Sequence, residues 1–310
     1  MLNLNNVIFF SGTSNLPLAR KIAKNLKIKL GKITVKRFAD DEIYVNIREN
    51  VVGKECIVIQ SCSTPGNEYL IELLIIVDAI KRLQPKKIVV LLPFYPYRRQ
   101  EKKIEKGESI TAELVAKLLH SVGIDKLIVL DLHSKVIEKF FKFPFRHITA
   151  LSLFVEYFKK QIKKKTRKDF IVCAPDRGAL TLNLKLAQKL GLETTFIFKT
   201  RARRHDVVMG MKLMDHVENK NVIMLDDEIS TGGTIVLASR LLKKNNAKDI
   251  FVAVTHPVLS GNAVKKLARA PIKQLIVTDS INLSKEKKIS KIKILSLSKI
   301  LAEEIKLLNL

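Results

Sequence analysis

The sequence predicts an α/β protein with two similar, doubly wound domains whose sheets are mostly parallel. Short apolar runs alternate with helical patterns along the whole chain, which is typical of this fold class. A strand–helix–strand pattern also occurs twice, at 87–133 and at 221–256. The 310 residues are enough for two domains, and we expect these to span 1–148 and 149–310.

The first half contains apolar, strand-like runs separated by segments with helical spacing. The segment 67–83, for example, has apolar residues at positions 70, 73, 74, 77 and 83, close to the period of a helix. We therefore expect strands at 7–11, 33–38, 43–48, 56–60, 88–92 and 127–132, and helices at 16–26, 67–83 and 111–121.

The second half repeats this plan. In such sheets ligands bind beyond the carboxyl ends of the strands, so we expect the functional residues to follow these strands. The expected strands are 170–174, 195–198, 222–225, 250–254, 275–278 and 292–295, and the expected helices are 179–190, 234–245, 262–270 and 299–308.

The composition excludes several classes of protein. The longest apolar run, 70–80, has about half of the ~20 residues that a membrane span needs and contains Glu72 and Asp78. The N-terminus shows no secretory signal pattern, so we expect a cytoplasmic protein. The odd number and the spacing of Cys56, Cys62 and Cys173 do not suit disulfides or a zinc site, which predicts buried, reduced thiols.

The net charge of +26 suggests anionic partners. However, the lysines are spread over the whole chain, aromatic residues make up only 6%, and tryptophan is absent. No recognisable nucleic-acid-binding module occurs, so we do not expect specific nucleic-acid binding. A positive field that gathers anionic substrates accounts for the charge more simply.

One segment carries the clearest chemical signal. A buried-strand run, 222–225, ends in Asp226 and Asp227, and a glycine-rich turn and an amphipathic helix follow. Adjacent glycines allow a tight turn, and the N–H groups of the turn and of the helix N-terminus can then hold a phosphate. The acidic pair suits sugar hydroxyls or a metal ion. The alternative is a turn that only caps the helix. The residues of the expected phosphate cradle are Ser230, Thr231, Gly232, Gly233 and Thr234.

This segment resembles the phosphoribosyl-pyrophosphate-binding motif of phosphoribosyltransferases and ribose-phosphate pyrophosphokinases. The resemblance implies domains of the phosphoribosyltransferase type, a loop that binds a 5-phosphate, and an acidic pair that contacts ribose hydroxyls. It indicates the class of ligand, but it does not separate the two families.

Further segments between about residue 8 and residue 305 resemble ribose-phosphate pyrophosphokinases. The segment Arg37-Phe38-Ala39-Asp40-Asp41-Glu42 is similar to the family's Arg-Phe-Ser/Ala-Asp-Gly-Glu. The resemblance implies that Phe38, Asp40 and Glu42 hold the adenine of ATP in a neighbouring subunit, and hence a homo-oligomer. From the residues alone, a solvated loop is also possible.

A second segment of this kind is Tyr97-Arg98-Arg99-Gln100-Glu101-Lys102-Lys103, which follows the expected strand 88–92. It is similar to the family's Tyr-Ala-Arg-Gln-Asp-Lys/Arg-Lys/Arg and implies that Arg99 and Gln100 contact ATP. Guanidinium groups suit phosphates, but as a bare cluster this could equally be a basic surface loop.

Two segments imply Mg²⁺ as the cofactor. Strand alternation is expected to place Asp131 and His133 on the same side of one strand end. In the family, the histidine of this Asp-Leu-His segment binds the magnesium of Mg-ATP. Asp176, in the segment 174–179, matches Ser-Pro-Asp-x-Gly-Gly/Ala and suits a magnesium-linked carboxylate. A lone histidine could also have only a structural role.

The basic segment 199–205 corresponds to the family's flexible catalytic loop. Its crowded cations also favour a mobile segment on physical grounds, although a solvated basic turn is possible. The resemblance implies that Lys199 and Arg201 stabilise the transition state. The segments 255–257 and 260–263 also match the family, but we assign them no chemical role.

The implied activity is transfer of the diphosphoryl group of ATP to the 1-hydroxyl of ribose 5-phosphate, which gives phosphoribosyl pyrophosphate and AMP for nucleotide biosynthesis. The alternatives are a non-catalytic regulatory relative and a phosphoribosyltransferase. The chain departs from the family at Ser230, where many members have Asp, and at Gly178-Ala179, where many have two glycines. The change at Ser230 indicates a subgroup of the family and not a loss of activity, and regulation by phosphate and ADP varies between subgroups.

Overall fold

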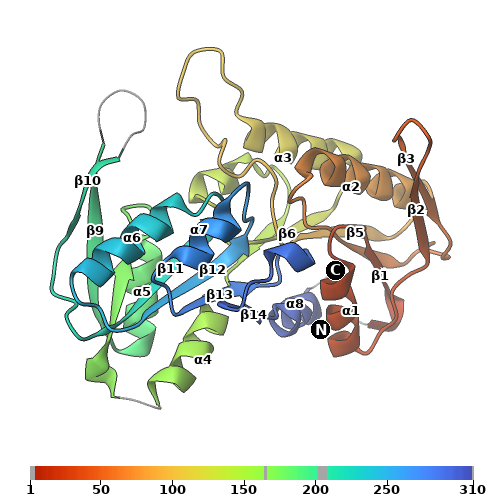
Figure 1. Ribbon diagram of the computed structural model, residues 1–310. Helices are drawn as coiled ribbons and strands as arrows, with labels where there is room; N and C mark the ends of the chain where they lie inside the picture. The colour runs from red at the N-terminus through yellow and green to blue at the C-terminus, as the bar shows by residue number, and fades with distance from the viewer. Residues whose placement is uncertain (1–3, 164–165, 202–207, 309–310) are drawn as a thin grey trace. The chain divides into compact units, whose positions relative to one another are not determined.

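The computed structural model describes residues 4–163, 166–201 and 208–308 (Figure 1). The chain divides into two compact units. The first unit contains residues 1–149, 280–282 and 296–310, and the second contains residues 150–279 and 283–295. The units therefore differ from the expected domains at the C-terminus, where the chain returns to the first unit twice.

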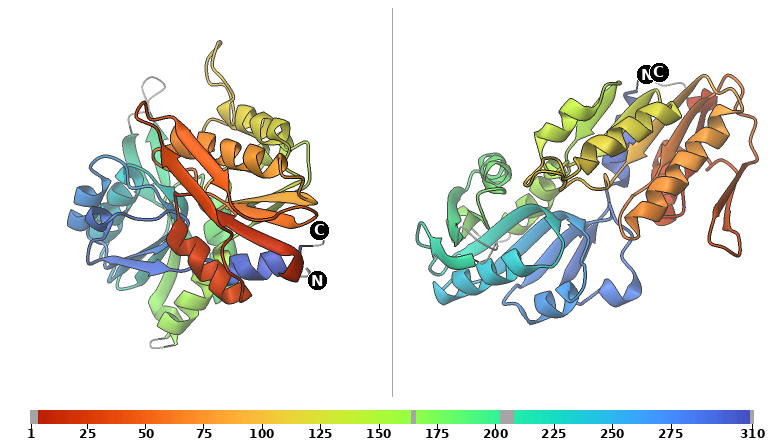
Figure 2. Two further views of the ribbon diagram at one scale, coloured as in Figure 1. Left: turned by 90° about the vertical axis from the view of Figure 1, so that its right-hand side faces the viewer. Right: turned by 90° about the horizontal axis from the view of Figure 1, so that it is seen from above.

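The first unit is built on a five-stranded parallel sheet with the order β1-β4-β5-β6-β7. Helices α1 and α8 cover one face, and α2 and α3 lie side by side on the other (Figure 2). Both faces are covered, which explains why its central strands are continuous apolar runs. The strands are β1 (Val7–Ser11), β4 (Glu55–Ile59), β5 (Lys87–Leu92), β6 (Lys126–Leu130) and β7 (Phe145–Ile148), and the helices are α1 (Leu16–Leu26), α2 (Gly66–Lys81), α3 (Thr111–Val122) and α8 (Ser298–Lys306), with 3₁₀ turns at Leu4–Asn6 and Lys135–Phe140.

Strands β2 (Ile33–Arg37) and β3 (Ile43–Ile47) form a separate two-stranded antiparallel sheet in the first unit. Next to it, a single parallel bridge between Phe9 and Leu30 extends the main sheet beyond β1. The hairpin therefore leaves the sheet where a further strand would otherwise lie.

The second unit contains a seven-stranded sheet with the order β10-β9-β8-β11-β12-β13-β14, in which only β10 is antiparallel to its neighbour. The chain passes from β8 to β9 in one direction and from β11 to β14 in the other, so the topological switch point lies between β8 and β11. The strands are β8 (Phe170–Ala174), β9 (Glu193–Arg201), β10 (Val208–Leu213), β11 (Asn221–Ile229), β12 (Ile250–Pro257), β13 (Gln274–Thr278) and β14 (Ile292–Leu295), and the helices are α4 (Leu151–Ile162), α5 (Leu180–Leu190), α6 (Gly233–Lys244) and α7 (Ala263–Arg269), with 3₁₀ turns at Arg167–Asp169 and Lys285–Lys287.

The two sheets have the same strand order over β1-β4-β5-β6-β7 and β8-β11-β12-β13-β14. The strands that correspond in these two sheets are not the ones that the sequence repeat paired. The strand that follows the hairpin is β4 in the first unit and β11 in the second. By position in the sheet, β5 thus corresponds to β12, and the repeat at 87–133 and 221–256 is displaced by one strand. Successive strand–helix–strand units look alike in sequence, so periodicity alone could not fix this alignment.

The C-terminal segments belong to the first unit because specific contacts hold them there. Helix α8 packs on α1, where Asn25 Nδ2 donates a hydrogen bond to Ser298 Oγ at 3.0 Å. The buried side chains of Asn15 and Ser61 both donate to the carbonyl oxygen of Ser280, at 3.3 and 2.6 Å. These contacts join residues more than 200 positions apart, which no local sequence pattern predicts.

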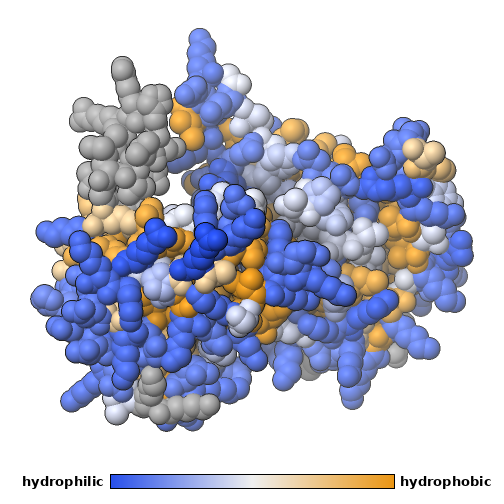
Figure 3. Space-filling view, viewed as in Figure 1, coloured by the Kyte–Doolittle hydropathy of each residue, from blue (hydrophilic) through white to orange (hydrophobic). Residues whose placement is uncertain are grey.

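All three cysteines are free and buried, which confirms the prediction of reduced thiols. Burial raises the pKa of Cys56 and of Cys173 to about 12. None of the helices in the described part of the chain is long and apolar enough to cross a membrane. The face of the molecule in Figure 3 is covered mainly by hydrophilic side chains, as the many lysines lead one to expect.

Candidate functional site

The expected phosphate cradle forms the turn between β11 and α6. Gly232 is in the left-handed conformation, with φ of 74°, and directly precedes the first residue of α6. Within the described residues, no side chain caps this helix, and its first turn contains no acidic residue. The first N–H groups of a helix have no partner within the helix, and together with the helix dipole they favour an anion at this end.

The acidic pair lies inside β11, not after it. The expected strand ended at residue 225, whereas β11 continues to Ile229 because its pairing with β12 continues, with Glu228 opposite His256. Asp226 and Asp227 are half-buried, and Asp227 N–H donates to Asp226 Oδ1 at 2.9 Å.

The structure brings Asp176 close enough to Asp226 to act on its charge. The pKa of Asp226 is raised well above its usual value, first by burial, then by the neighbouring Asp227 carboxylate and more weakly by Asp176. Asp176 itself accepts a hydrogen bond from the Ala179 N–H at 3.2 Å, and a Cβ atom at position 178 would lie 3.3 Å from Asp176 Oδ1. Gly178 therefore leaves room around this carboxylate.

A bound cation suits this cluster chemically, because it would relieve the repulsion between the carboxylates. No group of three or more His, Cys, Asp and Glu side chains is arranged as a ready metal cage in the described ranges. Mg²⁺ usually binds through one or two carboxylates together with substrate phosphates, so the residues fit a magnesium ion that arrives with a nucleotide.

The loop after β12 supports the phosphate cradle. Ser260 N–H donates to the carbonyl oxygen of Ser230 at 3.0 Å, and Leu259 N–H donates to that of Ile229 at 3.0 Å. The segment 260–263, to which the sequence assigned no role, is thus hydrogen-bonded to the start of the cradle.

Sequence reasoning missed Asn183, which is buried in α5 beside the end of β11. Its side chain is hydrogen-bonded to both backbone groups of Leu225, the residue before Asp226. The sequence did contain a signal: Asn183 is a polar residue in line with the buried apolar face of α5, which includes Leu186, Ala187 and Leu190.

In the first unit, His133 follows β6 but is not part of it. The strand ends at Leu130, and Asp131 has a positive φ of 36°, so the expected strand alternation of Asp131 and His133 was wrong. The side chain of His133 is exposed. The segment is instead positioned by His147, whose Nε2 accepts the Leu132 N–H at 3.0 Å.

Arg99 and Gln100 lie in the loop between β5 and α3, and both are exposed. Gln100 connects this loop to the start of α3, because its Oε1 accepts the Thr111 hydroxyl at 2.6 Å. The neighbouring Arg98 differs sharply: it is only 2% exposed and lies over the ring of Phe94, 5.5 Å from its centroid. The basic cluster therefore contains one buried cation, Arg98, and three exposed ones, Arg99, Lys102 and Lys103.

Phe38, Asp40 and Glu42 form the turn of the β2–β3 hairpin, and all three are exposed. The Phe38 side chain is 56% exposed, and its ring centroid lies 5.6 Å from that of Tyr44 in an edge-on arrangement. The exposed ring of Phe38, in the same turn as two carboxylates, offers a stacking surface that the first unit itself does not cover.

Lys199 and Arg201 belong to β9, which extends beyond the expected end at residue 198 because it pairs with β10. The backbone pairing places Lys199 opposite Met211 and Arg201 opposite Val208. The rest of the expected catalytic loop, residues 202–205, lies outside the described residues.

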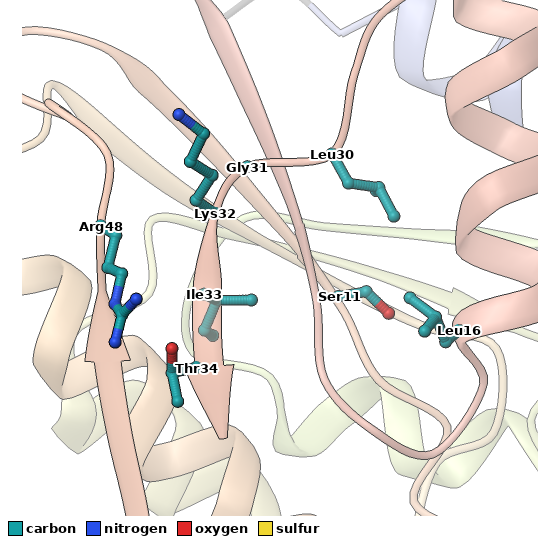
Figure 4. Close-up of a pocket in the computed structure, with 8 residues that line it drawn as sticks. All are labelled: Ser11, Leu16, Leu30, Gly31, Lys32, Ile33, Thr34 and Arg48. Atoms are coloured by element: carbon teal, nitrogen blue, oxygen red, sulfur yellow. The ribbon is translucent and has the colours of Figure 1, made fainter. Parts of the chain in front are cut away.

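A separate pocket of about 390 Å³ occurs in the first unit, between the end of β1 and the start of β2 (Figure 4). Arg48 lies near Thr34 on one side of it, and Leu16 lies near Ser11 on the other. None of the site residues that the sequence predicted is among its lining residues, which are Ser11, Leu16, Leu30, Gly31, Lys32, Ile33, Thr34 and Arg48.

Comparisons with known proteins agree with these features. Residues 7–123 match the N-terminal domain of ribose phosphate pyrophosphokinase, and residues 200–309 match the phosphoribosyl synthetase-associated domain. The chain is 43% identical to the ribose-phosphate pyrophosphokinase of Bacillus subtilis over 300 residues, which are 97% of this chain and 93% of that protein. It is 42% identical to that of Fusobacterium nucleatum, over 98% of this chain and 96% of that protein.

The fold leads to the same family. The crystal structure of phosphoribosylpyrophosphate synthetase from Mycobacterium smegmatis superposes with a TM-score of 0.90 and 37% identity, covering 97% of this chain and 98% of that one. Both units are accordingly α/β domains of the phosphoribosyltransferase type. With relatives above 40% identity over nearly its whole length, the chain belongs to the ribose-phosphate pyrophosphokinase family of enzymes.

Proposed function

We propose that the chain carries out the reaction of its family through the residues described above: it transfers the β,γ-diphosphoryl group of ATP to the 1-hydroxyl of ribose 5-phosphate. The products are phosphoribosyl pyrophosphate and AMP. The single observation that supports this most is the β11–α6 segment, in which two carboxylates precede an uncapped helix N-terminus.

The acceptor site is proposed to lie at this segment. The N–H groups of residues 230–234 and the hydroxyls of Thr231 and Thr234 would hold the 5-phosphate, because a helix N-terminus favours a dianion. Asp226 and Asp227 would accept hydrogen bonds from the ribose hydroxyls. Burial and the Asp227 carboxylate raise the pKa of Asp226 because they disfavour its charged form. A bound hydroxyl donor or cation would stabilise that charged form, which fits this role.

The donor site is proposed to use the first unit. Arg99 and Gln100 would contact ATP, while Phe38, Asp40 and Glu42 would hold the adenine of ATP in a neighbouring subunit. The exposure of the hairpin turn supports this assignment, because a residue that serves another subunit is uncovered in its own. A homo-oligomer of at least two subunits is therefore part of the proposal.

Mg²⁺ is the proposed cofactor, and one metal-binding residue is proposed in each unit: His133 in the first and Asp176 in the second. When bound with ATP, the ion would neutralise charge on the phosphate oxygens. The exposure of His133 and the influence of Asp176 on the charge of Asp226 support this assignment.

In the proposed reaction the ribose 1-oxygen attacks the β-phosphorus in line, and the bond to the oxygen between the α- and β-phosphorus breaks. Such transfers depend on positioning and on neutralising charge in the transition state. Lys199 and Arg201 would supply positive charge there. ATP and sugar phosphates are cytoplasmic metabolites, so the proposed location is the cytoplasm, and nucleic acid is not a proposed partner.

The test is an assay of the purified protein with Mg-ATP and ribose 5-phosphate, in which AMP and phosphoribosyl pyrophosphate are followed together. We expect the two products in equal amounts and no AMP when ribose 5-phosphate is omitted. A purified, folded protein that releases no AMP would contradict the proposal. That result is the one expected of a non-catalytic regulatory relative or of a phosphoribosyltransferase.

A further inference from the structure

The side chain of Asn183 occupies a place where a neighbouring strand would normally lie. Asn183 is 1% exposed, and its Oδ1 accepts the Leu225 N–H at 2.9 Å while its Nδ2 donates to the Leu225 carbonyl oxygen at 2.6 Å. The Nδ2 group also donates to the carbonyl oxygen of Ala179 at 2.8 Å, within α5. One amide therefore joins β11 to the helix beside it.

The sheet explains why this amide is needed. The pairing of β8 with β11 ends at Val172 and Ile223, two residues before Leu225, because the strands part at the switch point. The other side of β11 stays paired with β12 as far as Ile229. A parallel neighbour supplies one donor and one acceptor to alternate residues of a strand, and Asn183 supplies the same two groups to Leu225.

The position of Leu225 gives this arrangement a functional consequence. Asp226 and Asp227 follow it directly in β11. Without a partner at Leu225, two buried backbone groups would lose their hydrogen bonds, and the strand just before the acidic pair would no longer be held in place. A small displacement of a substrate-binding group is enough to weaken binding or catalysis.

We propose that Asn183 is a positioning residue for ribose 5-phosphate: it holds the backbone at Leu225 so that Asp226 and Asp227 face the sugar hydroxyls. This inference rests on the proposed function of the acidic pair. Asn183 does not touch the substrate in this account, and it acts through the strand.

The competing explanation is that Asn183 only stabilises the fold, and the chain contains a matched control. Asn221 is also a fully buried amide of the second unit, at the opposite end of the same strand, and its Nδ2 donates to the carbonyl oxygen of Asp169 at 3.0 Å. It lies four residues before Leu225, about 13 Å along a strand. In either variant, leucine replaces a buried amide by an apolar side chain of similar size.

The experiment compares N183L and N221L with the wild type by thermal melting and by steady-state kinetics, well below the melting temperatures. Both variants are expected to melt at lower temperature. Only N183L is expected to raise the KM for ribose 5-phosphate, by roughly tenfold, which corresponds to about 1.4 kcal/mol. The KM for ATP is expected to stay within about twofold in both, since Asn183 positions only the acceptor side.

A KM for ribose 5-phosphate in N183L that matches that of N221L would overturn the inference. If N183L does not fold, N183A takes its place, because the smaller side chain can admit a water molecule. N183A is also expected to raise the KM for ribose 5-phosphate, and an unchanged KM would overturn the inference. Absence of activity in the wild type would instead contradict the proposed function, so the two failures are distinguishable.

Discussion

The Ser230 hydroxyl lies 3.5 Å from the Ser260 hydroxyl, whereas the backbones of the same two residues are joined by a shorter hydrogen bond of 3.0 Å. The side-chain contact is at the limit of hydrogen-bonding distance, so it contributes little. The start of the phosphate cradle is therefore held mainly by the main chain, which does not depend on the identity of residue 230. This is the position at which many members of the family have Asp.

Replacement of Ser230 by Ala should accordingly be mild. We expect the KM for ribose 5-phosphate to change by less than about threefold, because the lost contact is worth at most about 0.5 kcal/mol. Steady-state kinetics check this. Ser260→Ala should behave alike, and a tenfold effect in either variant would show that the hydroxyls themselves take part in binding.

Gly232→Ala should be severe. Its φ of 74° is unfavourable for alanine by about 1 kcal/mol or more, and the added Cβ would lie 3.4 Å from Leu267 Cγ. The turn must shift to relieve this strain, so we expect the KM for ribose 5-phosphate to rise by roughly tenfold or more.

Gly53→Ala is the control for backbone strain at Gly232. Gly53 has a similar φ of 65°, and a Cβ atom there would meet nothing within 4 Å. Both variants should melt at lower temperature, but the Gly53 variant should keep its substrate affinities. Equal kinetic effects in the two would mean that strain alone, and not the cradle, explains the result.

Asp226→Asn should stabilise the protein increasingly as the pH rises above about 4, while it abolishes activity. In the native protein the pKa of Asp226 is raised well above 3.8, so the native state binds this proton more tightly than the unfolded chain does. The resulting stability is complete below about pH 3.8 and is lost as the pH rises through the raised pKa. Asparagine cannot ionise and does not incur this loss.

Thermal melting without Mg²⁺ at several pH values between 5 and 8 checks this prediction. The variant should gain stability over the wild type as the pH increases. Addition of Mg²⁺ should raise the melting temperature of the wild type more than that of the variant. A variant that is less stable than the wild type at pH 8 would contradict the assignment of the raised pKa.

Lys199→Ala should reduce turnover far more than substrate binding. A cation that acts mainly in the transition state can contribute a factor of about 10³–10⁵ in rate, so kcat should fall by that order while both KM values stay within a few-fold. Lys212→Ala, on the neighbouring strand β10, is the control and should retain kcat. Unchanged turnover in the Lys199 variant would refute its catalytic role.

His147→Ala should weaken the use of Mg-ATP. His147 Nε2 accepts the Leu132 N–H, and its Nδ1 lies 2.6 Å from Glu138 Oε1, so the ring fixes the chain just before His133. We expect the KM for Mg-ATP to rise by about tenfold, the lower end of the range that is typical when a group that orients a metal ligand is lost. The KM for ribose 5-phosphate should not change.

His120→Ala is a suitable comparison for the His147 variant. His120 stacks on Phe143, with ring centroids 5.6 Å apart, in the same unit but away from His133 in the chain. If both variants change the KM for Mg-ATP equally, the effect reflects general loosening of the first unit and not the position of His133.

Several features could be predicted from the sequence because they are local. The apolar runs, the glycine pair at 232–233 and the acidic pair before it determine a strand, a turn and a helix within a dozen residues. The end of β11 could not be predicted in this way, because Asp226 and Asp227 are poor strand formers and only the pairing with β12 keeps them extended.

Other features depend on partners that are distant in the sequence. The turn at Asp131 breaks an apolar pattern that reads as a continuous strand. Asn183 looks like one polar residue in an amphipathic helix until β11 is placed beside it. The assignment of α8 to the first unit depends on its packing against α1, nearly the whole chain away.

That packing has a consequence for how a cell makes this enzyme. Helix α1, whose buried residues include Leu18, Ile22 and Leu26, packs against α8, and the ribosome synthesises α8 only after the whole second unit. Domains usually fold in their order of synthesis, N-terminal first. Here the first unit cannot complete its fold until the second unit has been synthesised. The nascent chain therefore lacks the packing of α8 against α1 through most of translation. A premature stop before residue 298 would damage the unit that was made first.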